Sequence, residues 1–260
     1  NTDEELRKAK INSQKRMDFW VPLLSNLPKR MKLVFVSGYF AKEVMEDTGI
    51  TLNPNQYSII HNPIDTGLFN YVEKDENQRT KVLSIRPYAS QKYANDLTVK
   101  AILELSKSKY FQDMEFMIVG AGRLFDEILE PIREFDNVKI HEGFLTHSEI
   151  AELHKEYGIF MTPTRMDSQG VSRDEAMSSG LVPITNAVTA IPEFVDDTCG
   201  ILAPGENFKS MAKGILKLLK DPILFKNMSY AAAERVRNQS STKIIINKEM
   251  DLFNDNEESI

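Results

Sequence analysis

The 260-residue chain has little of several features that would fix its class at once. Its one cysteine, Cys199, excludes an internal disulfide framework and a cysteine-rich zinc module, and it suits a reducing compartment. No apolar run approaches the roughly 18 residues of a membrane span, and the acidic, polar first residues do not form a signal peptide. Basic residues number 32 against 38 acidic ones, and this net charge of −6 argues against a nucleic-acid-coating protein.

What the chain does contain is typical of a soluble globular protein. Hydrophobic residues make up 42% and charged residues 27%, and the length suits one large domain or two small ones. The sequence starts at Asn1 without a methionine. We therefore expect a fragment of a longer cytoplasmic protein.

Positive charge is concentrated at the N-terminus. Residues 1–32 carry eight basic and four acidic side chains, and Phe19 and Trp20 lie among them. This segment is either a basic, aromatic element at the surface of the inner membrane or a solvated helix and linker that pack on a missing part of the protein. The second interpretation is favoured, because the apolar residues cluster at one end instead of forming a stripe.

From residue 31 onward, short β-branched apolar runs alternate with helix-length amphipathic stretches. Strands are predicted at 33–36, 57–60, 82–85, 115–119, 138–140, 159–161, 182–185 and 201–202. Helices are predicted at 39–48, 95–108, 122–134, 147–156, 171–179, 207–219, 222–237 and 242–254. This alternation indicates an α/β fold in which one doubly wound, mostly parallel, Rossmann-like sheet has helices on both faces.

Three segments follow from this pattern. Residues 1–30 are a linker or the remnant of an N-terminal domain, 31–240 form the Rossmann-like domain, and 241–260 form a C-terminal helix with an acidic tail. In such a sheet ligands bind beyond the carboxyl ends of the strands. Functional residues are therefore expected in the loops after the strands.

Two of these loops carry residues that could bind part of a nucleotide. Arg86 follows one strand and Lys92 comes six residues later, a pair that could grip a diphosphate or could be two solvated surface cations. Gly120 and Gly122 form a turn between a strand and a helix. A nicotinamide fingerprint would need a third glycine where Phe125 stands, so close approach to another nucleotide, or plain turn chemistry, is the better interpretation.

The next loop carries Phe144 and Leu145, which could form a backbone-lined pocket for a base, although Thr146 and Glu149 already explain the loop as a capping box. The loop after the strand at 159–161 is the most informative, and it is followed by a helix.

Gly170, Val171 and Ser172 would offer free N–H groups to an anion. Glu175, one turn inside the helix, could accept both hydroxyls of a ribose, and Asp167 could hold a second sugar. Taken singly, Asp167 is a loop carboxylate, and Asp174 and Glu175 are first-turn acids of a helix.

The order of these loops resembles the C-terminal half of family 4 retaining glycosyltransferases, which have the two-domain GT-B fold. The likeness runs from about Val34 to Ser240. It rests on "HNPID" at 61–65, the Arg86 and Lys92 pair, "VGAG", "HEGFLTHSEIAELH", and "PTRMDSQGVSRDEAMSSGLVPI" at 163–184.

The resemblance implies roles for these positions. Glu175 would bind the ribose, and Arg86 and Lys92 the diphosphate of the donor. Gly170, Val171 and Ser172 would place amides near the phosphates and sugar, and Asp167 would contact the sugar in place of the family's glutamate. Gly120, Gly122, Phe144 and Leu145 would line the nucleotide site.

The implied reaction moves a hexose, with retention, from a nucleoside-diphosphate sugar to a glycan or lipid-linked acceptor in bacterial surface polysaccharide synthesis. A UDP-type donor is favoured over a GDP-type one, and no metal or other cofactor is expected. The acceptor-binding N-terminal domain would be absent, so the chain alone would bind nucleotide without transferring sugar.

The alternative is a non-catalytic nucleotide-binding module. A hydrolase acid/base pair of Asp167 and Glu175 is disfavoured by the neighbouring cations.

Overall fold

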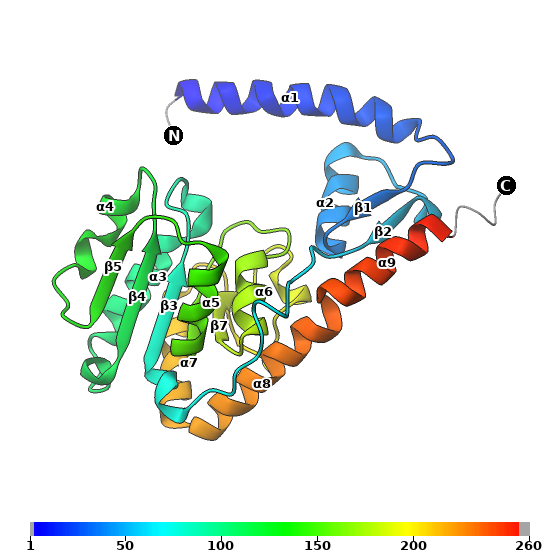
Figure 1. Ribbon diagram of the computed structural model, residues 1–260. Helices are drawn as coiled ribbons and strands as arrows, with labels where there is room; N and C mark the ends of the chain where they lie inside the picture. Colours follow the sequence, from blue (N-terminus) through cyan, green and yellow to red (C-terminus); the bar gives the residue numbers. More distant parts are fainter. Residues whose placement is uncertain (1–2, 255–260) are drawn as a thin grey trace.

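The computed structural model describes residues 3–254, which form a large parallel sheet covered by helices and a smaller unit beside it (Figure 1). The six-stranded sheet has the order β5-β4-β3-β6-β7-β8, with every neighbouring pair parallel. The predicted α/β, doubly wound fold with helices on both faces is confirmed. The end of the predicted acidic tail, residues 255–260, lies outside the described residues.

All eight predicted strands are present. Their bounds are β1 Leu33–Phe35, β2 Tyr57–Ile59, β3 Lys81–Ile85, β4 Glu115–Gly120, β5 Val138–Glu142, β6 Ile159–Met161, β7 Val182–Asn186 and β8 Ile201–Ala203. The expectation that they join one sheet is wrong, because β1 and β2 pair only with each other. The apolar pattern of a strand indicates that it is paired but not which strand is its partner.

The helices also follow the prediction closely, with one exception. Their bounds are α1 Asp3–Ser25, α2 Gly38–Thr48, α3 Asn95–Leu105, α4 Phe125–Leu129, α5 His147–Glu156, α6 Val171–Ser178, α7 Phe208–Lys220, α8 Pro222–Gln239 and α9 Thr242–Asn254. The predicted helix 122–134 is wrong in extent, since α4 has five residues and gives way to the 3-10 turn Glu130–Ile132. Pro131 cannot donate an amide hydrogen bond, and Gly122 has a positive φ of 145°.

Side chains alternate between the two faces of the large sheet. Val82 and Ile159 belong to the core under α3 and α7, whereas Leu83 and Phe160 belong to the core with Ala176 of α6. This period of two is what a sheet buried on both faces requires. The carboxyl ends of the strands are thereby fixed between two helical layers.

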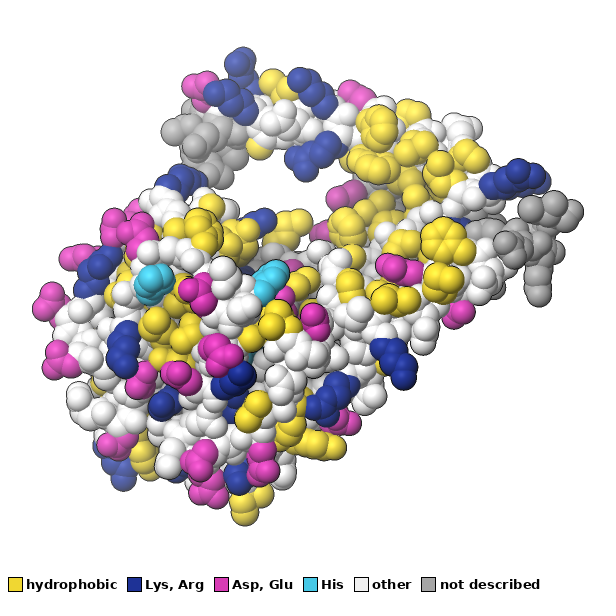
Figure 2. All heavy atoms as spheres, in the orientation of Figure 1, with side chains coloured by type: hydrophobic (Ala, Val, Ile, Leu, Met, Phe, Trp, Pro, Cys, Tyr) yellow, Lys and Arg dark blue, Asp and Glu magenta, His cyan; other side chains and the backbone are white. Residues whose placement is uncertain are grey.

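The small unit has a core of its own. Leu24 of α1, Phe35 of β1 and Ala41 of α2 are buried together with Leu52. Beyond this contact α1 extends along one side of the molecule, and apolar side chains gather over its C-terminal half and the neighbouring small unit (Figure 2). Phe19 is 62% exposed and Trp20 44% exposed. Among the described residues, no helix is long and apolar enough to cross a membrane.

Candidate functional site

The reversal of strand order between β3 and β6 places two loops side by side. In the six-stranded sheet the chain winds outward from β3 to β4 and β5 in one direction, and from β6 to β7 and β8 in the other. Val82 of β3 and Ile159 of β6 are neighbours at this point. The crevice at such a switch point is where open α/β sheets bind ligands.

A pocket of about 390 Å³ opens at this point, and we call it the switch-point pocket. Four loops that are far apart in the sequence supply its walls, which include seven of the predicted site residues. These are Arg86, Gly120, Phe144, Leu145, Val171, Ser172 and Glu175. Folding therefore brings most of the predicted nucleotide site together.

Arg86 places an almost fully buried cation in this pocket. The side chain is 6% exposed, and its Nη2 donates to the Pro163 carbonyl at 3.4 Å. Its Nε has no hydrogen-bond partner among the described residues. Burial lowers the pKa of Arg86, and the negative charge of Asp167 opposes that shift. A buried guanidinium whose donors are largely unused is suited to bind an anion.

Glu175 is the complementary group across the pocket. It lies one turn inside α6, half-buried, and its carboxylate has no hydrogen-bond or ion-pair partner in the described part of the chain. Burial raises its pKa to about 7, while the nearby His147 acts in the opposite direction. A desolvated carboxylate without a donor can accept hydroxyl hydrogens from a ligand.

The N-terminus of α6 lies in the same wall. Gly170 precedes it with φ 97°, and no side chain caps the helix. The positive φ favours glycine here, and a Cβ would also lie 2.7 Å from Nη1 of Arg173. The N–H groups at Val171 and Ser172 are therefore available to an anion in the pocket.

A buried ion pair supports this helix from beneath. Arg173 Nη2 lies 2.6 Å from Oδ1 of Asp174, and both side chains are almost completely buried. Gln169 Nε2 donates to Asp174 and also to the Asn62 carbonyl, both at 3.1 Å. Asp174, read from the sequence as a first-turn acid of the helix, is thus part of an internal network that anchors "HNPID" beside the site.

The loop 162–170 is held by side-chain clamps on both sides. Asn186 accepts from the Thr164 amide at 2.8 Å and donates to its carbonyl at 2.7 Å. Arg165 pairs with Asp96 at 2.8 Å and with Glu206 at 2.7 Å. The loop is therefore rigidly placed, as a preorganised site requires.

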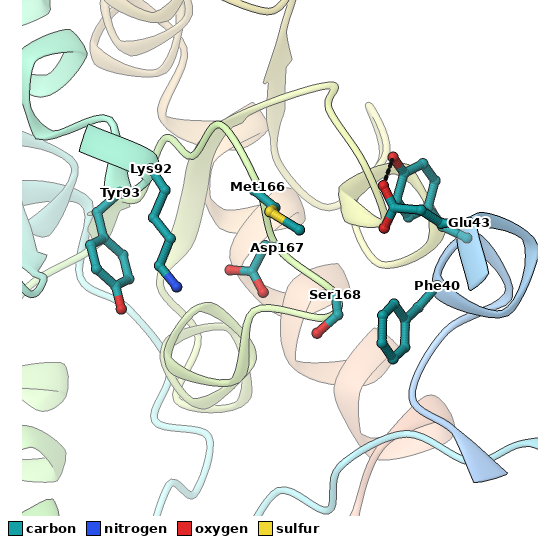
Figure 3. A pocket seen from close by; sticks show the side chains of 8 residues that line it. Phe40, Glu43, Lys92, Tyr93, Met166, Asp167 and Ser168 are labelled. Carbon is teal, nitrogen blue, oxygen red and sulfur yellow. Dashed lines mark hydrogen bonds between the residues drawn. The ribbon is translucent and has the colours of Figure 1, made fainter. Parts of the chain in front are cut away.

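Asp167 and Lys92 lie in a neighbouring pocket of about 320 Å³ between the large sheet and the small unit, which we call the inter-unit pocket. Figure 3 shows the two side chains on one wall, with Phe40 and Glu43 of α2 on the opposite wall. Tyr93 lines both pockets, so they adjoin one another. Its ring lies 5.2 Å from the Arg86 guanidinium and 5.0 Å from Lys92 Nζ.

Two predicted site residues line neither pocket. Gly122 packs on the chain after β3, where a Cβ would lie 2.4 Å from the Tyr88 carbonyl carbon. Gly170 fills its place above Arg173, as described. Both glycines are explained by close packing and a positive φ.

The sequence did not single out Tyr93, His147 or the α2 residues. An aromatic residue beside Lys92 is a signal that could have found Tyr93. His147 lines the switch-point pocket, whereas His154, on the same face of α5, is buried and burial lowers its pKa to about 3. Nothing in the sequence relates Phe40 or Glu43 to Asp167, because folding alone brings them together.

The described residues contain no group of three or more His, Cys, Asp or Glu side chains placed to hold a metal ion. The expectation of a metal-independent site stays a prediction.

Fold and pocket together define a doubly wound α/β protein with a crevice at its switch point that is lined by the buried Arg86 and the N-terminus of α6. Residues 79–221 match the model of the family described as glycosyl transferases group 1. This match covers more than half of the chain, so the protein belongs to that family, and the predicted glycosyltransferase resemblance is confirmed at this level.

Individual relatives agree with this assignment. The capsular polysaccharide biosynthesis glycosyltransferase CapM of Staphylococcus aureus is 23% identical over 239 residues, which are 89% of this chain and 58% of CapM. The chain therefore spans little more than half the length of this relative. The S. aureus poly(ribitol-phosphate) alpha-N-acetylglucosaminyltransferase is 27% identical over 146 residues, 54% of this chain and 29% of that protein.

Solved structures share the fold. S. aureus TarM, in a complex that includes UDP, has a TM-score of 0.75 at 19% identity, covering 92% of this chain and 46% of TarM.

Proposed function

We propose that this chain is the nucleotide-sugar-binding part of a retaining glycosyltransferase. The whole enzyme transfers a hexose from a nucleoside-diphosphate sugar to a glycan or lipid-linked acceptor in bacterial surface polysaccharide synthesis. The observation that carries the proposal is the switch-point pocket, in which Arg86, Glu175 and the N-terminus of α6 all have unused binding capacity.

Each part of a nucleotide sugar has a matching group in this arrangement. The ribose hydroxyls meet the Glu175 carboxylate, and the diphosphate meets Arg86 and the amides that begin α6. The base lies against Phe144 and Leu145, and Phe144 is 85% exposed at the pocket mouth. The sugar extends toward Asp167 in the inter-unit pocket, and Lys92, which lines the same pocket, joins Arg86 in meeting the diphosphate.

The charge that develops on the leaving diphosphate is met by fixed positive groups. Arg86 is buried before the ligand arrives, so its stabilisation of the leaving group requires little reorganisation. Asp167 stands on the sugar side, where its carboxylate can hold hydroxyls. Departure of the diphosphate thus needs only residues of this chain, which is the basis for proposing a metal-independent reaction.

A UDP-type donor is favoured over a GDP-type one. The solved relative TarM contains UDP. The HepE protein of Anabaena contains UDP and glucose, and it has a TM-score of 0.75 at 13% identity over 93% of this chain and 67% of HepE. The basic segment 1–32, with Phe19 and Trp20 of α1 exposed, supports peripheral binding to the cytoplasmic face of the membrane.

A thermal-shift panel of UDP, GDP, ADP and NAD in the presence of EDTA tests the proposal. UDP is expected to raise the melting temperature most, and Arg86→Ala is expected to remove most of that shift while leaving the small effect of uridine. Lys213→Ala, an exposed α7 lysine, is the matched control. A response to NAD alone, or to none of the four, contradicts the proposal.

A further inference from the structure

The chain is built from two units whose cores are separate. The core of the small unit contains Leu24, Phe35 and Ala41, and none of these belongs to the cores of the six-stranded sheet. After β2 the chain crosses toward the large sheet, and Ile64 is held there by hydrogen bonds with Ser240 at 2.8 Å and Thr242 at 3.0 Å. The small unit meets the large one where the Tyr39 side chain of α2 packs against the core that contains Ile191 and Phe194, and polar contacts are added at the same place.

A carboxylate of the large unit supplies two of these polar contacts. Glu193, in the 3-10 turn after β7, accepts from the Gly38 amide at 2.9 Å through Oε2 and from the Tyr39 amide at 2.6 Å through Oε1. These two amides begin α2. The third, that of Phe40, donates to the Ser37 hydroxyl at 3.2 Å. The N-terminus of α2 is thus capped by a residue about 150 positions away, in the other unit.

The same short segment holds the opposite wall of the inter-unit pocket. Thr189 Oγ1 donates to the Asp167 carbonyl at 2.8 Å and accepts from the Asp167 amide at 3.1 Å. Ala190 N also donates to the Asp167 carbonyl, at 3.3 Å. Gln239 of α8 fixes the Glu193 carbonyl at 3.0 Å. Residues 189–193 therefore connect Asp167 on one wall of the inter-unit pocket with α2 on the other.

We propose that Glu193 is a positioning residue that sets the distance between α2 and Asp167. Its carboxylate makes two charge-assisted hydrogen bonds and lies at the positive end of the helix dipole, so it holds α2 more firmly than a neutral cap. The consequence for sugar transfer rests on the proposed function, because the inter-unit pocket is where the donor sugar is expected. The geometry of the contact does not depend on that function.

The first test needs no ligand. Spin labels at Lys42→Cys on α2 and Lys213→Cys on α7 report the distance between the units by double electron–electron resonance, and the native Cys199, 1% exposed, is shielded from labelling. The doubly labelled protein that keeps Glu193 is expected to give one narrow distribution of label-to-label distances. Glu193→Ala should broaden and lengthen it, and Glu193→Gln, which keeps one acceptor oxygen, should lie between them.

A second variant removes the Gly38 amide donor and keeps the Glu193 side chain. Gly38→Pro replaces the Gly38 amide hydrogen with a ring carbon, which removes the donor and displaces Oε2 of Glu193 from it. The change is at the first position of a helix, where proline is favoured, and Ser37 already has the extended backbone that precedes proline (φ −155°, ψ 156°). It should broaden the distribution as Glu193→Ala does. Glu46→Ala, an exposed change on the same helix, is the control and should leave the distribution narrow. An unchanged distribution in both Glu193→Ala and Gly38→Pro overturns the proposal.

Ligand binding separates positioning from a loss of stability. Glu193→Ala should weaken UDP-glucose binding about tenfold relative to UDP, because only the sugar reaches the inter-unit pocket. Equal losses for UDP and UDP-glucose, with an unchanged distance distribution, would show that Glu193 acts through stability alone. Failure of the parent chain to bind either ligand would contradict the proposed function, and the distance measurement would still decide the role of Glu193.

Discussion

Glu175→Gln should stabilise the empty protein and at the same time weaken nucleotide binding. Burial raises the pKa of Glu175 to about 7 from its ordinary value of 4.5. A group whose pKa is raised on folding contributes stability that is fully present below about pH 4.5 and is lost as the pH rises through about 7. At pH 8 the wild-type protein therefore holds a charged carboxylate in an unfavourable place, and glutamine does not.

The size of the effect follows from the shift. Each pKa unit corresponds to about 1.4 kcal/mol, so the shift sets an upper bound of about 3.4 kcal/mol. Glu175 is only half-buried, and solvent screening reduces this to about 1–2 kcal/mol. For a chain of this length the melting temperature at pH 8 should rise by roughly 2–6 °C. Near pH 4.5 the variant and the wild type should melt together.

Binding should change in the opposite direction. Loss of a charge-assisted hydrogen bond costs about 1.5–3 kcal/mol, so UDP affinity should fall by about 10- to 150-fold. Wild-type affinity should itself increase between pH 6 and pH 8, because the ionised carboxylate is the better acceptor.

Calorimetric titration and thermal melts across this pH range measure both effects, with the exposed Glu127→Gln as control. Unchanged melting at pH 8 together with unchanged UDP affinity would refute the assignment of Glu175.

Three further predictions concern the walls of the site. Phe144→Ala should weaken UDP binding by about 1–3 kcal/mol, the range for loss of base stacking, and should leave the melting temperature unchanged; equal affinity in calorimetry would remove Phe144 from the base site. Arg173→Met should lower the free energy of unfolding by about 3–5 kcal/mol, because it leaves Asp174 buried without its partner, and denaturant titration measures this. Gly120→Ala should cost about 3 kcal/mol, since its Cβ would lie 2.0 Å from the Arg86 carbonyl oxygen, whereas Gly205→Ala, with open space around it, should be neutral in the same titration.

The sequence predicts the large sheet well because each strand carries its own apolar run and is followed by turn or helix-start signals. Thr146 with Glu149 forms the predicted capping box, and Pro222 opens α8 as expected. The pairing of β1 with β2 was not predictable in this way, since partner choice depends on contacts between distant segments. Pro131 signalled the early end of α4, but the apolar pattern of residues 122–134 outweighed this signal in the prediction.

The residues of the candidate site likewise divide into those that the sequence predicts and those that only the folded chain reveals. Arg86, Glu175, Val171 and Ser172 could be predicted, because strand ends of a doubly wound sheet meet at the switch point. Residues outside those loops could not. Glu193 caps a helix that begins about 150 residues earlier, and this contact exists only in the folded chain.

A crystal structure of the chain with UDP tests the central claim most directly. We predict that the ribose hydroxyls lie within hydrogen-bonding distance of the Glu175 carboxylate, and that the diphosphate contacts Arg86 and the amides of Val171 and Ser172. UDP bound outside the switch-point pocket, or bound in it with the ribose directed away from Glu175, would contradict the account.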